Sequence, residues 1–82
     1  MKNERQLLKA ARELDEKALL DIYDHFAPKV YLQALQLCHD PVQADAVVGK
    51  VFERFLEEMA NGRELHQGLK VYFHQSAGQF LS

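Results

Sequence analysis

Apolar residues recur at spacings of three and four along most of the chain, which is the repeat of an amphipathic helix. The clearest such stretch runs from Asp40 to Met59. Asp40 is a favourable N-cap, and Pro41 suits the first helical position because its missing N–H would have no partner inside the helix. The apolar stripe of this stretch comprises Ala44, Val47, Val48, Val51, Phe52, Phe55, Leu56 and Met59. We therefore predict a helix that buries this stripe and exposes a polar side that includes Glu53, Glu57 and Glu58.

Two further helices are predicted before this stretch. The first covers residues 4 to 14, with Leu7, Leu8, Ala11 and Leu14 on its apolar side. Asp15 then offers an N-cap to a longer helix that continues to about Cys38. The apolar positions of that longer helix are Leu19, Ile22, Tyr23, Phe26, Val30, Tyr31, Ala34, Leu35, Leu37 and Cys38.

Pro28 lies inside the longer helical pattern, where a proline costs about 3 kcal/mol because it lacks an N–H and crowds the preceding turn. Two outcomes are open: a kinked long helix, or two helices that meet near residues 25–28. The apolar phase continues from Phe26 to Val30 and Ala34, and no Gly, Asn or Ser stands near the proline. This pattern favours the kinked helix.

The last predicted helix spans about Leu65 to Leu81, after Asn61-Gly62 ends the preceding one. Gly62 is a natural left-handed residue at a helix C-terminus. The apolar positions of the last helix are Leu65, Leu69, Tyr72, Phe73, Ala77 and Phe80. The fold class predicted is therefore all-α: a compact bundle of about four helices, in a single domain over residues 1–82, whose short connections favour antiparallel neighbours.

Composition narrows the class of protein. Apolar residues make up 48% and charged residues 27% of the chain, as in an ordinary globular domain. The net charge of −2 lacks the basic footprint of a protein that binds nucleic acid mainly through phosphates. No apolar run approaches the roughly 20 residues that cross a bilayer, and the N-terminal residues do not resemble a signal peptide. We expect a cytoplasmic protein with no membrane association.

The residue types of catalysis and metal binding occur without their usual spacings. His25, His39, His66 and His74 form no H-x-x-x-H, E-x-x-H or C-x-x-C-type pair with any neighbour, which favours surface or turn histidines. Cys38, the single cysteine, excludes an intramolecular disulfide and is expected to be a buried structural residue. We therefore expect that the protein is not an enzyme, has no catalytic residue and binds no metal or cofactor.

Aromatic and polar residues of the last helix are candidates for contact with nucleic-acid bases. Aromatics at helical spacing usually belong to the core, but adjacent positions such as Tyr72 and Phe73 cannot both point fully inward. Lys70, Tyr72 and Gln75 can form a mixed polar and aromatic surface.

Three motifs resemble region 2 of bacterial sigma factors of the sigma-70 family, most of all the extracytoplasmic-function (ECF) group. They are D-E-x-A-L-x-x-I-Y-x-x-F-A-P-K-V-Y-x-x-A-L over residues 15–35, D-P-x-x-A-x-x-V-V-x-x-V-F-x-R-F over residues 40–55, and L-K-V-Y-F-H-Q-S-A-G-Q-F-L over residues 69–81. The resemblance implies a helical domain whose third helix docks on the clamp helices of core RNA polymerase. It also implies that the last helix recognises and helps melt the promoter −10 element.

Carried over position by position, the resemblance assigns two sets of site residues. The implied polymerase-binding face consists of Gln43, Ala46, Gly49, Lys50, Glu53 and Arg54, and on the last helix the resemblance points to Tyr72, Gln75 and Gln79. Lys70 and His74, which are candidates by residue type alone, complete the set of DNA-binding candidates. The family usually has an acidic residue in place of Ala46 and a Gln-Glu pair in place of Gly49 and Lys50. Tyr72 stands where the family often has Trp.

These observations lead to one main hypothesis and two alternatives. The main hypothesis is an ECF-like region 2 domain that binds core RNA polymerase and promoter −10 DNA in transcription initiation, with an anti-sigma protein as a candidate regulator. The first alternative is a degenerate sigma-like interaction module that binds a regulator or itself through the exposed part of the Val47–Phe55 surface, without promoter recognition. The second is a helical domain whose resemblance is only structural.

Overall fold

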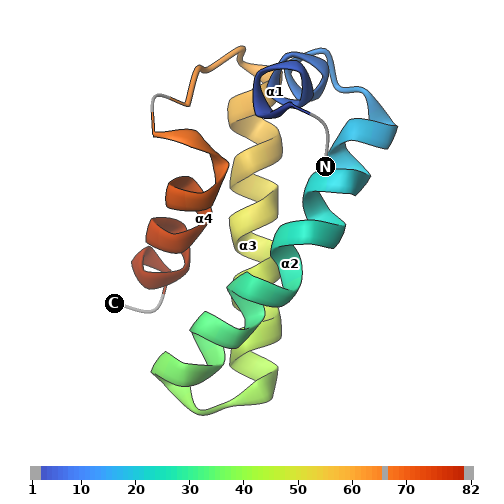
Figure 1. Cartoon of the computed structure of the whole chain (residues 1–82). Helices are drawn as coiled ribbons and strands as arrows, with labels where there is room; N and C mark the ends of the chain where they lie inside the picture. Colours follow the sequence, from blue (N-terminus) through green and yellow to red (C-terminus); the bar gives the residue numbers. More distant parts are fainter. Residues whose placement is uncertain (1–2, 66, 81–82) are drawn as a thin grey trace.

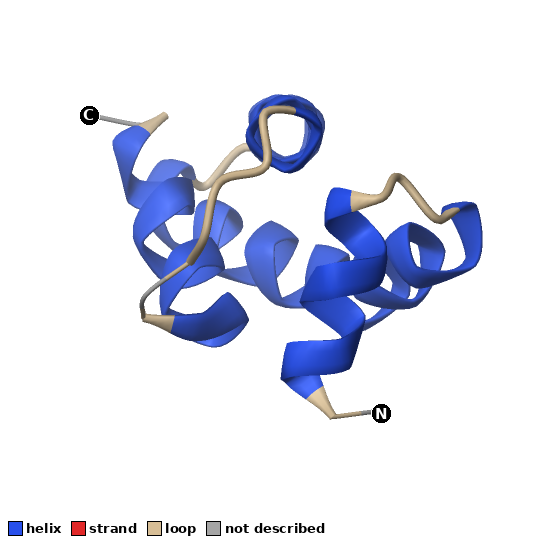
Figure 2. Ribbon diagram, turned by 90° about the horizontal axis from the view of Figure 1, so that it is seen from above, coloured by secondary structure: helices blue, strands red, loops and turns tan. Residues whose placement is uncertain are grey.

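Four helices make up the fold in a computed structural model that describes residues 3–65 and 67–80. They are α1 (Glu4–Arg12), α2 (Glu16–Cys38), α3 (Pro41–Ala60) and α4 (Gly68–Gln79). Helices α2 and α3 form a long antiparallel pair, α4 lies alongside α3, and α1 crosses one end of the pair (Figure 1). Seen from above, the described residues contain only helices and loops (Figure 2). The all-α prediction with four helices is confirmed.

The starts of α2 and α3 are capped by the two predicted aspartates. The Asp15 Oδ1 accepts from the backbone N–H groups of Lys17 (3.0 Å) and Ala18 (3.3 Å). The Asp40 Oδ1 accepts from the Val42 N–H (3.0 Å), and Pro41 is the first residue of α3. These bonds satisfy backbone donors that have no partner within the helix.

Helix α2 passes through Pro28 as one continuous element. Its direction changes along its length in Figure 1, as expected where a proline interrupts the hydrogen-bond ladder. Pro28 is exposed, so water can reach the carbonyl that lacks its usual partner. The single-helix prediction is therefore confirmed, and the alternative of two separate helices is wrong.

Four phenylalanines from three helices form the centre of the core. The Phe73 ring of α4 stacks on Phe26 of α2 at a centroid distance of 4.9 Å and on Phe52 of α3 at 4.8 Å. The Phe55 ring lies 5.1 Å from Phe73. Offset aromatic pairs contribute beyond the area they bury, so Phe73 connects α4 to both long helices. The other buried apolar residues are Leu7, Leu8, Ala11, Ala18, Ile22, Val30, Ala34, Ala44, Val47, Val48, Val51, Met59, Leu69 and Ala77.

The predicted end of the first helix is wrong. Helix α1 ends at Arg12, and Leu14 is 51% exposed with a left-handed φ of 59°. The Leu14 N–H donates to the Ala11 carbonyl (2.9 Å) and the Asp15 N–H to the Ala10 carbonyl (3.0 Å), which is the Schellman pattern. The same pattern ends α3, where Gly62 takes the left-handed position with a φ of 73°. Leu14 thus occupies a position that usually belongs to glycine.

Three further apolar positions were assigned to the wrong side of their helices. Tyr23 and Leu37 of α2 are 46% and 57% exposed, and Leu56 of α3 is 43% exposed. Each lies at the edge of its apolar stripe. Tyr23 still meets α3, because its ring lies 4.8 Å from the Phe52 ring. Periodicity defines the centre of a buried stripe better than its edges.

The predicted start of the last helix is also wrong. Helix α4 begins at Gly68, while Leu65 lies in the preceding loop and packs half-buried against the core. Gly68 has a φ of 83°, which a right-handed helix cannot include in its interior. The predicted end at Leu81 lies outside the described residues. Within the described ranges, no helix is both long and apolar enough to span a membrane.

Candidate protein and nucleic-acid interfaces

The outer side of α3 carries the six positions assigned to polymerase contact. Gln43, Ala46, Gly49, Lys50, Glu53 and Arg54 are all exposed. The apolar residues between them, from Val47 to Phe55, are all buried. Between Gln43 and Arg54 the outer face of α3 therefore carries polar, charged and small residues, and it rests on a packed inner face. The interaction-module alternative requires exposed apolar residues between Val47 and Phe55. All the apolar residues of this segment are buried in the core, so they are not available to a partner.

The five DNA-binding candidates of α4 lie in three different places. Lys70 and His74, four residues apart, line a cleft between α4 and α2. Tyr72 and Gln75 line a second cleft, which α3, α4 and the loop between them form. Gln79 accepts a hydrogen bond from the Arg54 guanidinium of α3 (3.3 Å). The mixed surface of Lys70, Tyr72 and Gln75 does not form, because Lys70 lines a different cleft from the other two.

The cleft that Tyr72 and Gln75 line, here called the α3–α4 cleft, has a volume of about 300 Å³. It is lined by Glu58, Arg63, Glu64, Leu65, Gln67, Gly68, Tyr72 and Gln75. The Glu58 Oε1 lies 3.8 Å from the Arg54 Nε and 3.7 Å from the Arg63 Nη1. The Glu58 side chain is only 15% exposed, so its predicted place on a solvated acidic face is wrong. Helix α4 and the loop cover it.

Two buried polar atoms in the α3–α4 cleft lack hydrogen-bond partners among the described residues. They are the second carboxylate oxygen of Glu58, Oε2, and the Tyr72 hydroxyl. Burial, and after it the neighbouring Glu58 carboxylate, raises the pKa of Tyr72 above its ordinary value. The carboxylate acts on the phenol first as a nearby hydrogen-bond acceptor and then through its charge, although the geometry between the two groups is not that of a good hydrogen bond. The protonated phenol is thus a donor, and the carboxylate is an acceptor.

The histidines and the cysteine form no chemical site in the part of the chain that the structure describes. His25, His39 and His74 are exposed, and His66 lies outside the described residues. No three metal-ligating side chains gather within residues 3–65 and 67–80. Cys38 is half-buried and its thiol donates to the Asp40 carbonyl (3.4 Å), so the expected full burial is wrong.

Sequence reasoning did not single out Lys29, Gln33, Glu58 and Arg63 as site residues. The Gln33 side-chain amide donates to the His74 carbonyl (2.8 Å) and thereby bridges α2 and α4. Lys29 stands four residues after His25, and this spacing is the one local signal for its place. Glu58 and Arg63 come together only because the loop after α3 turns back over the helix, which no periodicity encodes.

Comparisons with protein-family models, with curated proteins and with solved structures each gave no match. The fold class therefore rests on the structure alone. No similar protein indicates a function for the two clefts or the α3 face.

Proposed function

We propose that this domain acts as an ECF-like sigma region 2 and docks on the clamp helices of core RNA polymerase through the outer face of α3. One observation carries the proposal: all six positions that the motif resemblance assigns to polymerase contact are exposed along a single helix. The inner face of the same helix is packed into the aromatic core, so the contact face is held rigid. A preorganised helix loses little conformational freedom on binding.

Charge on the α3 face gives the docking its expected specificity. Lys50 and Arg54 alternate with Glu53 and Glu57 around a shallow hollow of about 330 Å³. Charges of both signs at the rim of an interface steer encounter and select the partner more than they raise affinity. Binding to isolated clamp helices is therefore expected to weaken with added salt.

Binding of purified domain to core polymerase, and to an isolated clamp-helix fragment, tests this proposal. Gly49→Gln with Lys50→Glu restores the polar pair typical of the family and is expected to tighten binding. A Cβ at position 49 would meet no atom within 4 Å, so a side chain can begin there without a clash. Gly49→Ala is the matched control, because it gains helix propensity without the polar pair. No binding by the unmodified domain, or no gain beyond the control, would contradict the proposal.

The α3–α4 cleft supports a second role, in binding single-stranded −10 promoter DNA. A base with an exocyclic amino group can donate to a carboxylate, and the Glu58 Oε2 has no hydrogen bond of good geometry among the described residues. Because this oxygen is fully buried, the cleft must widen for a base to reach it. The Tyr72 hydroxyl offers a donor beside it, and Arg63 lines the same cleft. Because the net charge is −2, base contacts rather than phosphate contacts are expected to carry this binding.

Anisotropy of a labelled −10 oligonucleotide, with core polymerase present, tests the second role. Tyr72→Phe and Glu58→Gln are each expected to weaken binding several-fold, since a buried hydrogen bond contributes about 1 kcal/mol. Lys70→Gln, in the other cleft, is the matched control and should leave binding unchanged. Equal effects of all three variants would contradict a base-binding role for the α3–α4 cleft.

A further inference from the structure

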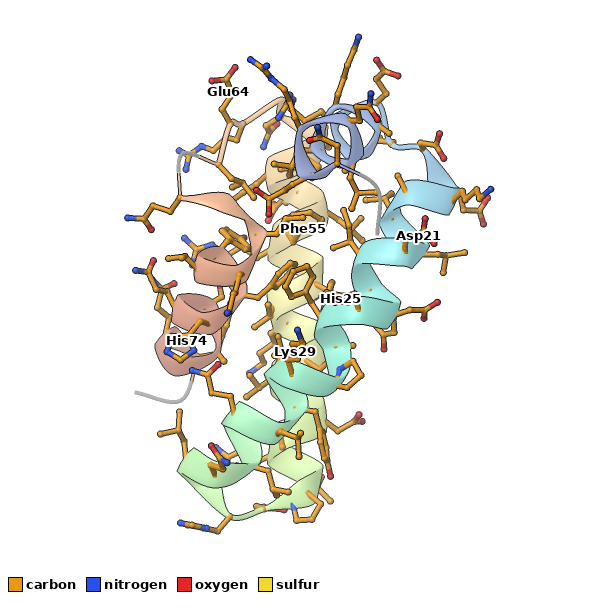
Figure 3. All side chains as sticks on the ribbon, in the orientation of Figure 1. Asp21, His25, Lys29, Phe55, Glu64 and His74 are labelled. Atoms are coloured by element: carbon orange, nitrogen blue, oxygen red, sulfur yellow. The ribbon has the colours of Figure 1, made fainter. Side chains whose placement is uncertain are left out.

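The cleft that Lys70 and His74 line, here called the α2–α4 cleft, has a volume of about 350 Å³ and a largely apolar lining. Phe26 and Val30 of α2 and Phe73 of α4 form its apolar part, and Lys29 and Lys70 line it from the two helices. Figure 3 shows His25 and Lys29 side by side on α2, with His74 on α4 across the gap. The hydrogen bond from Gln33 to the His74 carbonyl (2.8 Å) fixes the spacing of the two helices.

The charge of the α2–α4 cleft is opposite to that of the whole chain. None of its lining residues is acidic, and Lys29 and Lys70 are both exposed. The Lys29 Nζ lies 3.3 Å from the His25 Nε2 and 5.7 Å from the centre of the Phe26 ring. Asp21 stands one helical turn before His25 and does not line the cleft. A basic rim on a chain of net charge −2 selects for an acidic partner.

The apolar part of the cleft suits an aliphatic anchor better than a nucleic-acid base. Leu32 lines the cleft and is 57% exposed, which leaves an apolar side chain without a partner. The rings of Phe26 and Phe73 are instead buried against each other at 4.9 Å, with 4% and 2% exposure. Stacking of bases requires exposed aromatic faces, and these rings present none.

We propose that the α2–α4 cleft binds an acidic amphipathic helix of a partner protein. The apolar side chains of that helix, three and four residues apart, pack on the exposed Leu32, and its carboxylates pair with Lys29 and Lys70. The cleft shares no residue with the α3 face assigned to polymerase, so this inference stands independently of the proposed function.

Fluorescence anisotropy with a defined probe tests the inference. The probe is a labelled synthetic helix with leucines at positions i, i+3, i+4 and i+7 and glutamates on its remaining surface. Lys29→Glu with Lys70→Glu is expected to weaken binding about tenfold at low salt, because reversing two charges turns two attractions into repulsions. The reversed variant is also expected to bind the same peptide with lysines in place of glutamates more tightly than the unmodified domain does.

The matched control is Lys9→Glu with Lys50→Glu, which makes the same change in net charge at exposed positions outside the cleft. It should retain binding of the acidic peptide, and the cleft variant should retain the core-polymerase binding of the unmodified domain. Circular dichroism melting checks that each variant folds. If the cleft variant does not fold, Leu32→Gln tests the same binding site. It removes the exposed apolar side chain and is expected to weaken binding of the acidic peptide several-fold.

Five results would overturn the inference. Three concern the peptides: no binding of the acidic peptide, equal loss in the cleft variant and its control, and equal binding of the acidic and basic peptides by the unmodified domain. The fourth is tighter binding of oligothymidylate than of the acidic peptide, which would assign the cleft to nucleic acid. The fifth comes from sedimentation velocity, since a dimer abolished by the cleft variant would assign the cleft to a second copy of the chain.

Discussion

Helices α3 and α4 are held in place in different ways. Helix α3 carries its own signals: Asp40 caps the Val42 N–H, Pro41 begins the helix, and Gly62 closes it. Helix α4 has no side-chain cap from Gln67. Its Leu69 N–H instead donates to the Glu4 Oε1 of α1 (3.1 Å), a residue at the other end of the chain. A helix with weak local signals can thus be positioned by a distant partner.

The two helices nevertheless depend on the same core. Phe52 and Phe55 of α3 enclose Phe73 of α4, and both helices pack against α2. The difference between them therefore concerns their ends, where α3 is specified locally and α4 by tertiary contact. Four experiments on α3 and α4 follow, from the largest expected effect to the smallest.

Removal of a shared core ring should affect both helices alike. Phe52→Ala is expected to reduce the free energy of unfolding by about 3–5 kcal/mol, because the 8%-exposed ring packs on Tyr23, Phe55 and Phe73. Leu56→Ala, four residues later and 43% exposed, is the control and should cost under about 1 kcal/mol. Urea unfolding measures both. Similar losses would contradict the assignment of Phe52 to the core.

The two left-handed glycines should respond differently to alanine. Gly62→Ala and Gly68→Ala each introduce a side chain at positive φ, at a cost of about 1–2 kcal/mol. At Gly68 the added carbon would also lie 3.0 Å from the Glu4 Oε2, whereas nothing lies within 4 Å at Gly62. Gly68→Ala should therefore cost more, because the Glu4 carboxylate must shift slightly, which weakens its bond to the Leu69 N–H. Equal costs in urea unfolding would argue against this contact.

The caps of the two helices should differ in their coupling to other residues. Asp40→Ala and Glu4→Ala are each expected to cost about 1 kcal/mol, since each removes an acceptor for a helix N-terminal N–H. Glu4→Ala should also reduce the cost of Gly68→Ala, and Asp40→Ala should not. A double-mutant cycle by urea unfolding measures this coupling. Additive costs for Glu4 and Gly68 would separate the two residues.

Tyr72 provides the smallest expected change and a pH signature. Tyr72→Phe should change stability by less than about 1 kcal/mol at neutral pH, because the buried hydroxyl has no partner among the described residues. The raised pKa of Tyr72 means that folding disfavours the ionised phenol. The protonated phenol therefore favours the folded state fully at pH values below its ordinary pKa of 10.0. This contribution to the free energy of unfolding is lost as the pH rises above 10.0.

Urea unfolding of both proteins between neutral and alkaline pH measures this signature. The unmodified domain should lose stability above pH 10 more steeply than Tyr72→Phe, since the variant lacks this titrating group. Parallel pH profiles for the two proteins would place the Tyr72 hydroxyl in water.

The residues that could be predicted from the sequence are those with a local physical cause. Asp15 and Asp40 cap helices through N–H groups two or three positions away, so the helix starts followed from neighbouring residues alone. The outer face of α3 from Gln43 to Arg54 followed in the same way, because periodicity separates the two sides of a helix. The candidates on α4 did not form one surface, because periodicity does not tell which neighbouring helix each side of α4 meets.

The sequence by itself determined the helical class, the limits of α3 and the apolar residues at the centre of each stripe, because spacing and capping act within a few residues. Only the tertiary structure decided the exposure of Leu14, Tyr23, Leu37 and Leu56, since coverage depends on which helix lies opposite. It also decided that Glu4 holds the start of α4 and that Glu58 is buried beside Tyr72. Those contacts join segments far apart in the chain, and no short-range pattern encodes them.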